Sequence, residues 1–183
     1  MIIAVDIDNT INNLQEAVIK LFNEQHGTNY TLTDFNDYDI ENVLPVKEAV
    51  AMKEMYGDND IYDYVKPLTG AKEGLQKLIS DGDQVYLVTA AIPKNYYQKV
   101  EWIHHFFPFV DDAHIVSMKH KGLFNCDIMI EDNIKNLIAS TLYHRICVDY
   151  PWNRNVHDYV YDIHRCANWN EIVKAVKKIK EKE

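Results

Sequence analysis

The first five residues, MIIAV, are a continuous apolar run that ends at the acidic residues Asp6 and Asp8. A strand exposed on one face alternates apolar and polar residues, whereas a strand buried on both faces of a parallel sheet does not. The run therefore predicts a central parallel strand with two acids at its carboxyl end. Two carboxylates repel by roughly 4 kcal/mol at about 4 Å with an effective dielectric near 20. We therefore expect a cation or a shared proton to offset the repulsion between Asp6 and Asp8.

Strand and helix patterns alternate along much of the remaining chain. Strands are predicted at residues 85–88, 114–116, 127–130 and 145–148, and helices at 13–25, 71–80, 96–107, 134–142 and 169–180. In this alternation each helix carries the chain back to the same edge of the sheet, by a right-handed crossover. The predicted fold class is α/β, with a doubly wound parallel sheet.

Residues 28–66 differ in composition from the alternating strand and helix segments. They are rich in acids and aromatics, carry short helical patterns such as 46–55, and end at Pro67. Together with the helix that precedes them, we interpret residues 13–66 as a small helical cap inserted after the first strand. Residues 1–12 and 67–183 would then form the α/β core.

Length, charge and cysteine usage limit the function further. A chain of 183 residues fits one domain with a small insertion, and its net charge of −9 argues against stable nucleic-acid binding. The three cysteines have no metal-binding spacing, which is typical of reduced thiols in the cytosol. The absence of a leader pattern and of apolar runs near about 18 residues argues against secretion and membrane spanning. We therefore predict a cytoplasmic protein, and leave a homodimer open.

Polar residues follow three of the predicted strands. Asp6 and Asp8 follow the first, Thr89 the second, and Glu131 with Asp132 a later one. Ligands of open α/β sheets bind outside the carboxyl ends of the strands, so we expect these side chains to converge. Grouped carboxylates suit a hard cation such as Mg²⁺, and a hydroxyl on the rim suits a phosphate.

Two lysines, Lys119 and Lys121, precede the last of these strands. An ammonium group beside a metal and two acids completes the equipment for phosphoryl transfer through an aspartyl-phosphate. Surface lysines are common, and only the spacing to Asp132 favours Lys121 over Lys119.

Four features of the chain resemble, in the same order, the motifs of the haloacid dehalogenase (HAD)-like phosphatases. They are Asp6–Thr10, Thr89, Lys121 and Glu131–Asp132. Within that superfamily the chain is most similar to the 5'(3')-deoxyribonucleotidases. The supporting stretches are KPLTGA (66–71), VTAAI (88–92), Lys99 with Trp102, KGLFNCDIMIEDN (121–133) and YPWN (150–153). The resemblance implies a Rossmann-like HAD core, a C1-type cap, and Mg²⁺-dependent hydrolysis of a small phosphomonoester, above all a (deoxy)nucleoside monophosphate.

The resemblance also implies roles for the matching acids. Asp6 would be the nucleophile, and Asp8 the general acid that later serves as the base. Asp6, the backbone carbonyl of Asp8, and Asp132 would hold Mg²⁺, with Glu131 in the outer shell of the metal. The family usually has aspartate where this chain has Glu131.

The remaining implied contacts are with the substrate. Thr89 and the backbone around Ala90 would bind the phosphoryl oxygens, Lys121 would neutralise developing charge, and Lys99 is a second candidate phosphate contact. Ala90 stands where the family often has a hydroxyl. Phe35 and Tyr38 fall where the family's cap presents aromatics, and are predicted to stack on a base.

Three alternatives stay open, one of which is a catalytically silent binding domain. The same chemistry could serve another small phosphorylated metabolite or a nucleic-acid 3'-phosphate. A signalling receiver domain, in turn, shares the acid pair, the threonine, the lysine and an aspartyl-phosphate. It needs its phosphorylated aspartate on a later strand, however, and the strand before Thr89 offers none.

Overall fold

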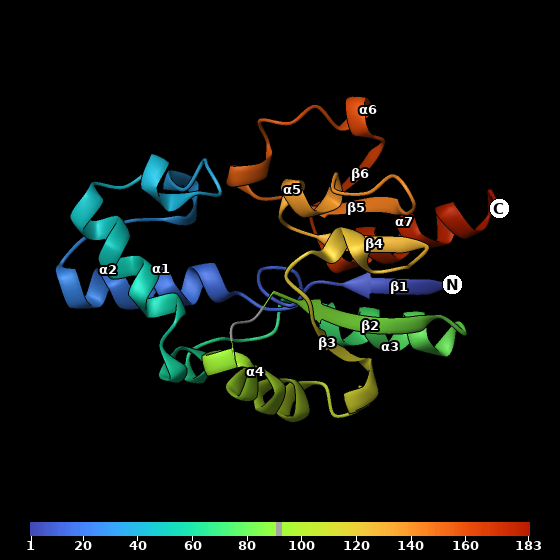
Figure 1. The fold of residues 1–183 in the computed structure, drawn as a ribbon, viewed down its shortest axis with the longest axis horizontal. Coiled ribbons are helices and arrows are strands. Elements are labelled where there is room, and N and C mark those ends of the chain that lie inside the picture. Colours follow the sequence, from blue (N-terminus) through green and yellow to red (C-terminus); the bar gives the residue numbers. More distant parts are fainter. Residues whose placement is uncertain (91–92) are drawn as a thin grey trace.

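The computed structural model describes residues 1–90 and 93–183. Within these residues six strands form one parallel sheet in the order β3-β2-β1-β4-β5-β6, which confirms the predicted doubly wound α/β core (Figure 1). The strands are β1 (Ile2–Val5), β2 (Gln84–Thr89), β3 (Ile115–Ser117), β4 (Ile128–Glu131), β5 (His144–Val148) and β6 (Ile163–Cys166).

Helices cover both faces of this sheet. Helices α3, α4 and α7 contribute to the larger apolar cluster on one face, and α5 contributes to a smaller cluster on the other. None of the helices within the described ranges is long and apolar enough to cross a membrane. The helices are α1 (Leu14–His26), α2 (Val46–Tyr56), α3 (Ala71–Ser80), α4 (Pro93–Phe106), α5 (Ile134–Leu137), α6 (Asp158–Tyr161) and α7 (Trp169–Lys180).

Strand β1 lies at the centre of the sheet and is buried on both faces, as its unbroken apolar run predicts. Ile3 and Val5 belong to the larger cluster, whereas Ala4 belongs to the smaller one. From β1 the chain proceeds outward through β2 and β3, and then returns to β4 on the other side of β1. This reversal opens a crevice at the carboxyl ends of β1 and β4, where ligands of such sheets bind.

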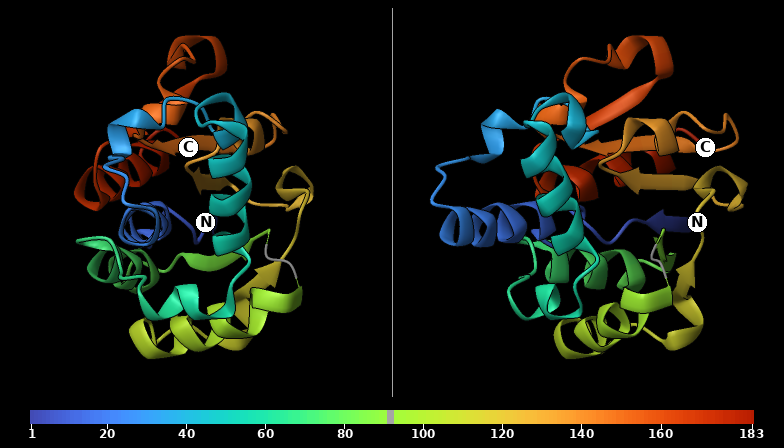
Figure 2. Two further views of the ribbon diagram at one scale, coloured as in Figure 1. Left: turned by 90° about the vertical axis from the view of Figure 1, so that its left-hand side faces the viewer. Right: turned by 60° about the vertical axis from the view of Figure 1, so that its left-hand side comes forward.

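Residues 13–66, the inserted segment, contain α1, α2 and several short 3-10 turns. The two ends of this segment lie side by side where the chain leaves and re-enters the core. The Asn13 backbone N–H donates to the Lys66 carbonyl at 3.0 Å, and the Lys66 backbone N–H donates to Asn13 Oδ1 at 2.7 Å. Both helices lie beyond the carboxyl ends of the strands (Figure 1), and in the left view of Figure 2, which looks toward those ends, α2 lies in front of them. These paired ends support our proposal that the segment is a separate cap.

Close packing between α3 and α7 anchors the turn that follows β1. A Cβ atom on Gly74 would lie 2.4 Å from Cε3 of Trp169, so only glycine admits this indole. The Trp169 side chain is buried, and its Nε1 donates to the Thr10 carbonyl at 2.9 Å. The first turn of α7 therefore supports the backbone next to the predicted nucleophile.

One predicted helix is shorter than its periodicity indicates. The helix expected over residues 134–142 ends at Leu137. Arg145 of β5 donates to the Leu137 carbonyl at 2.9 Å and to the Ser140 carbonyl at 2.6 Å. The Arg145 side chain thus supplies the hydrogen bonds that these carbonyl groups would otherwise accept from a further helical turn.

Strand β6 was not predicted, although it completes the sheet beside β5. Its middle residues, His164 and Arg165, are polar and only partly buried. An edge strand with this composition has neither a continuous apolar run nor strict alternation, so periodicity does not reveal it.

Candidate active site

The turn after β1 separates the two acids. The Asp6 amide donates to the Ile130 carbonyl of β4 at 2.9 Å, so Asp6 continues the sheet. Asn9 has a φ of 57°, in the left-handed region that asparagine tolerates better than most residues. The chain reverses there, and Asp6 and Asp8 contact different groups.

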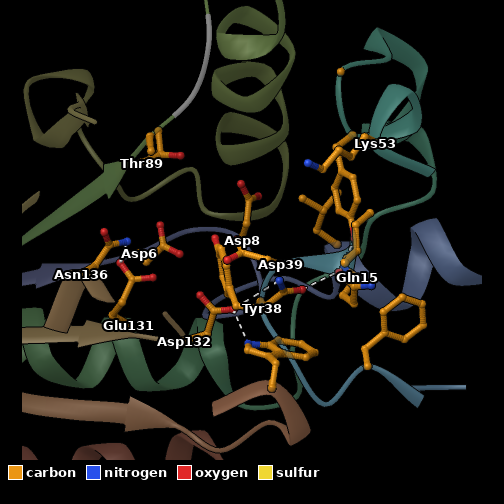
Figure 3. Close-up of a pocket in the computed structure, with 18 of the residues that line it drawn as sticks. Asp6, Asp8, Gln15, Tyr38, Asp39, Lys53, Thr89, Glu131, Asp132 and Asn136 are labelled. Atoms are coloured by element: carbon orange, nitrogen blue, oxygen red, sulfur yellow. Dashed lines mark hydrogen bonds between the residues drawn. The ribbon is translucent and has the colours of Figure 1, made fainter. Parts of the chain in front are cut away.

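Asp6 belongs to a buried cluster of three acids. Its carboxylate lies with those of Glu131 and Asp132, and one oxygen from each lies within 4.8 Å of the others (Figure 3). Lys121, whose side chain is 2% exposed, donates to Asp6 and, at 2.6 Å, to Glu131. Lys119 is exposed, so it is Lys121 that the structure brings into the cluster.

The electrostatics of the cluster favour a cation. Burial, together with the charge of Glu131, raises the pKa of Asp6 to about 8 despite the opposing effect of Lys121. Burial and the charges of Glu131 and Asp6 raise the pKa of Asp132 well above its usual value. Burial also works against ionisation of Glu131, but Lys121 holds the pKa of that carboxyl below its usual range. One ammonium group thus does not balance three acids, and a divalent cation would.

Three protein groups donate hydrogen bonds to the Glu131 carboxylate. Its Oε2 accepts from Lys121 and from Asn136 Nδ2 at 3.1 Å, and its Oε1 accepts from the Asn133 amide at 3.2 Å. An acid held in this way fits the outer shell of a metal better than direct coordination. The carboxylate oxygens of Asp6 and Asp132 are ligands of the kind that Mg²⁺ prefers.

The YPWN tract, noted in the sequence only as a resemblance, holds Asp132 in place. Trp152 Nε1 donates to Asp132 Oδ2 at 3.2 Å, and Asn153 Nδ2 donates to the Asp132 carbonyl at 2.8 Å. The Tyr150 and Trp152 rings stack with centroids 4.3 Å apart and 5° between their planes. Both the backbone and the side chain of Asp132 are therefore fixed from outside the acid cluster.

Asp8 has a different environment. Its Oδ1 accepts from Tyr62 Oη at 2.8 Å and from Asn12 Nδ2 at 3.1 Å, and its Oδ2 accepts from Lys99 Nζ at 2.6 Å. Burial works against ionisation, but Lys99 and these hydrogen bonds lower the pKa of Asp8 below its usual value. Lys99 also donates to Thr89 Oγ1 at 2.8 Å, which joins Asp8 to the end of β2. Asn12 and Tyr62 were not predicted as site residues from the sequence, because no motif marks them.

A cavity of about 490 Å³ extends from these groups to the inserted segment, within the usual size range of small-molecule sites. Tyr38 borders it and is 47% exposed (Figure 3). Phe35 also borders it, but is only 1% exposed and packs edge-on against Tyr30. Its ring is thus part of the segment's core. Ala90 borders the cavity, whereas residues 91–92 of the VTAAI stretch lie outside the described residues.

Solved structures show which class of protein has this fold. The chain resembles a HAD family hydrolase from Deinococcus radiodurans R1, solved with bound phosphate and sodium, with a TM-score of 0.65, 14% identity, and 97% and 95% of the two chains covered. A haloacid dehalogenase-like family protein from Streptococcus pneumoniae matches with a TM-score of 0.62, 15% identity, and 96% and 97% coverage. The fold is that of the HAD-like hydrolases.

The family follows from the sequence comparisons. The family described as 5' nucleotidase, deoxy (pyrimidine), cytosolic type C protein (NT5C) matches residues 1–182, and the chain belongs to it. The 5'(3')-deoxyribonucleotidase of Bacillus subtilis (strain 168) is 28% identical over 173 residues, covering 93% of this chain and 95% of the relative. These findings confirm the resemblance drawn from the motifs. The protein is a phosphatase, and this excludes the alternative of a signalling receiver domain.

Proposed function

We propose that this chain is a Mg²⁺-dependent phosphatase that hydrolyses (deoxy)nucleoside monophosphates through an aspartyl-phosphate on Asp6. The observation that carries the mechanism is the position of Asp6, in contact with Lys121 and within the acid cluster, on the border of the cavity. Asp8 borders the same cavity and contacts Lys99 instead. The family description and the name of the Bacillus subtilis relative support a nucleotide as the substrate.

The metal would be held by Asp6, the backbone carbonyl of Asp8, and Asp132, with Glu131 in its outer shell. The raised pKa values of Asp6 and Asp132 support this assignment, because a cation relieves the repulsion that raises them. When bound, Mg²⁺ supplies positive charge that offsets both the acids and the phosphoryl oxygens.

In the first step a carboxylate oxygen of Asp6 forms a bond to phosphorus, and the bond from phosphorus to the ester oxygen breaks. Asp8 gives its proton to the departing oxygen. We expect the phosphoryl oxygens to draw Lys99 away from Asp8, since Lys99 already contacts Thr89 at the phosphate end. The pKa of Asp8 would then rise, as a general acid requires.

In the second step the Asp8 carboxylate takes a proton from a water molecule. The water oxygen forms a bond to phosphorus, and the bond between phosphorus and Asp6 breaks. Inorganic phosphate leaves, and both carboxyl groups return to their starting state. Lys121 offsets the negative charge of the Asp6 carboxylate before the attack and after hydrolysis, and the charge of the neighbouring phosphoryl oxygens in between, because it contacts that carboxylate directly.

A panel of phosphomonoesters tests this proposal. With Mg²⁺, purified protein is expected to give its highest kcat/KM on a nucleoside monophosphate, and EDTA is expected to abolish turnover. The panel includes 5'- and 3'-phosphates of deoxy- and ribonucleosides, sugar phosphates, and an oligonucleotide 3'-phosphate. A higher kcat/KM on either of the last two classes would contradict the substrate, and no turnover at all would contradict the chemistry.

Trp152→Phe is expected to raise the Mg²⁺ concentration for half-maximal activity by about tenfold, a typical effect of losing an outer partner of a metal ligand. Phenylalanine keeps an aromatic ring beside Tyr150 but loses the hydrogen bond to Asp132. Trp102→Phe is the control, because Trp102 Nε1 donates to the Val65 carbonyl instead. Equal Mg²⁺ requirements in the two variants would show that Trp152 does not orient the ligand.

The cellular location and the oligomeric state remain predictions from the sequence. The three cysteines are free, buried thiols, which supports a reducing compartment, and we keep the cytoplasm as the proposed location. A homodimer likewise stays a prediction.

A further inference from the structure

Two amide side chains on the border of the cavity each leave one polar atom unpaired. Gln15 is 7% exposed and Asn95 is 9% exposed. Among the described residues, Gln15 Nε2 and Asn95 Oδ1 have no hydrogen-bond partner. A buried donor or acceptor without a partner costs free energy, so such atoms are uncommon in folded proteins. The mechanism derived above uses neither of them.

Tyr56, at the end of α2, orients both amides. Its hydroxyl donates to Gln15 Oε1, and its carbonyl accepts from Asn95 Nδ2 at 3.1 Å. Because a carbonyl can only accept, the nitrogen of Asn95 must face Tyr56, and its Oδ1 is the atom left over. The three elements α1, α2 and α4 thus fix one free donor and one free acceptor.

The two amides lie at the leaving-group end of the site. The backbone N–H of Gln15 donates to Asn9 Oδ1 at 2.8 Å, and Asn9 directly follows Asp8. Asn95 lies one helical turn before Lys99 on the same face of α4, and its side chain contacts Tyr56 of the inserted segment. In the proposed mechanism the phosphoryl group lies against Asp6 and Thr89 and draws Lys99 toward it. A substrate group that extends past Asp8 toward Tyr56 is therefore the alcohol portion.

We propose that Gln15 and Asn95 are specificity-determining residues that bind the hydrogen-bonding edge of a nucleobase. Gln15 Nε2 donates to an acceptor on the base, and Asn95 Oδ1 accepts from a neighbouring N–H. This inference rests on the proposed function, and deepens it by assigning which groups distinguish a nucleotide from other phosphomonoesters. An N–H beside a carbonyl or ring nitrogen is common to nucleobases and is absent from a sugar phosphate.

The test compares two substrates that share sugar and phosphate. For Gln15→Met, we expect kcat/KM on the preferred deoxynucleoside 5'-monophosphate to fall at least about tenfold more than on deoxyribose 5-phosphate, which has no base. Methionine keeps the length of the side chain but loses the donor, together with the oxygen that accepts from the Tyr56 hydroxyl. Gln25→Met is the matched control, because Gln25 is exposed on the same helix. Thermal unfolding of each variant reports whether the fold is kept.

A binding measurement separates recognition of the base from a general disturbance. Inhibition by the nucleoside product should weaken at least about fivefold in Gln15→Met, whereas inhibition by inorganic phosphate should keep its wild-type strength. Asn95→Leu should show the same pattern. Each substitution also loses one bond to Tyr56, from its hydroxyl in Gln15→Met and to its carbonyl in Asn95→Leu, so the unchanged inhibition by inorganic phosphate decides the question.

Equal losses on both substrates in Gln15→Met, or equal weakening of both inhibitors, would overturn the inference while leaving the proposed function intact. The wild-type enzyme alone tests the proposed function. If it turns over deoxyribose 5-phosphate as well as it does every nucleotide, the nucleotide assignment fails and the inference fails with it.

Discussion

Asp6→Asn is expected to lower kcat by at least about 10⁴-fold on every phosphomonoester, because an amide does not form the covalent phosphoryl intermediate. The substitution is nearly isosteric and removes one of three mutually repelling buried acids. We therefore expect the unfolding temperature to stay at or above that of the wild type. Phosphate release measures the first quantity, and a thermal melt the second.

Asp127→Asn is the matched control for Asp6→Asn. Asp127 precedes β4 at the opposite end of the sheet, where its Oδ2 accepts from the Ile2 amide at 2.6 Å. An asparagine oxygen can still accept there, so turnover should be close to that of the wild type. If Asp6→Asn kept one hundredth or more of wild-type kcat, Asp6 would not be the nucleophile.

Lys121→Met is expected to destabilise the protein by about 3–5 kcal/mol, the usual cost of removing one partner of a buried ion pair. It leaves the buried carboxylates of Asp6 and Glu131 without their ammonium group. For a domain of this size the unfolding temperature should fall by about 10 °C. Turnover should fall by about 10²- to 10³-fold even at temperatures where the variant is folded.

The pH dependence of this stability loss follows from the two acids left behind. Without Lys121, the pKa values of Asp6 and Glu131 in the folded state should lie above their unfolded values. The destabilisation is then largest above those folded pKa values, and shrinks as the pH falls and the acids bind protons. Melting curves over a pH series measure this.

Lys119→Met is the control, because Lys119 is exposed and lies two residues away. It should keep both stability and turnover. Adding Asp6→Asn to Lys121→Met should restore part of the lost stability without restoring turnover, because the two side chains interact directly. If Lys121→Met had the same unfolding temperature as Lys119→Met, the assignment of Lys121 to the buried cluster would be wrong.

Sequence alone predicted the parallel sheet and the family. Continuous apolar runs mark strands buried on both faces, and position in the chain places acids at strand ends without any knowledge of tertiary contacts. It did not predict β6, because Arg165 and His164 give that edge strand no apolar period. Nor did it separate Phe35, which is buried, from Tyr38, which borders the cavity with an exposed ring.

The position of two acids directly after the strand in the MIIAVDID stretch was thus determined by the sequence, because a strand end and its neighbouring acids are local features. Only the tertiary structure decided what surrounds them. Tyr62 and Lys99, which hold Asp8, are 54 and 91 residues away from it in the chain. Trp152 is 20 residues from Asp132. Contacts over such separations depend on how the inserted segment, α4 and the last loop pack together, and no local pattern encodes that packing.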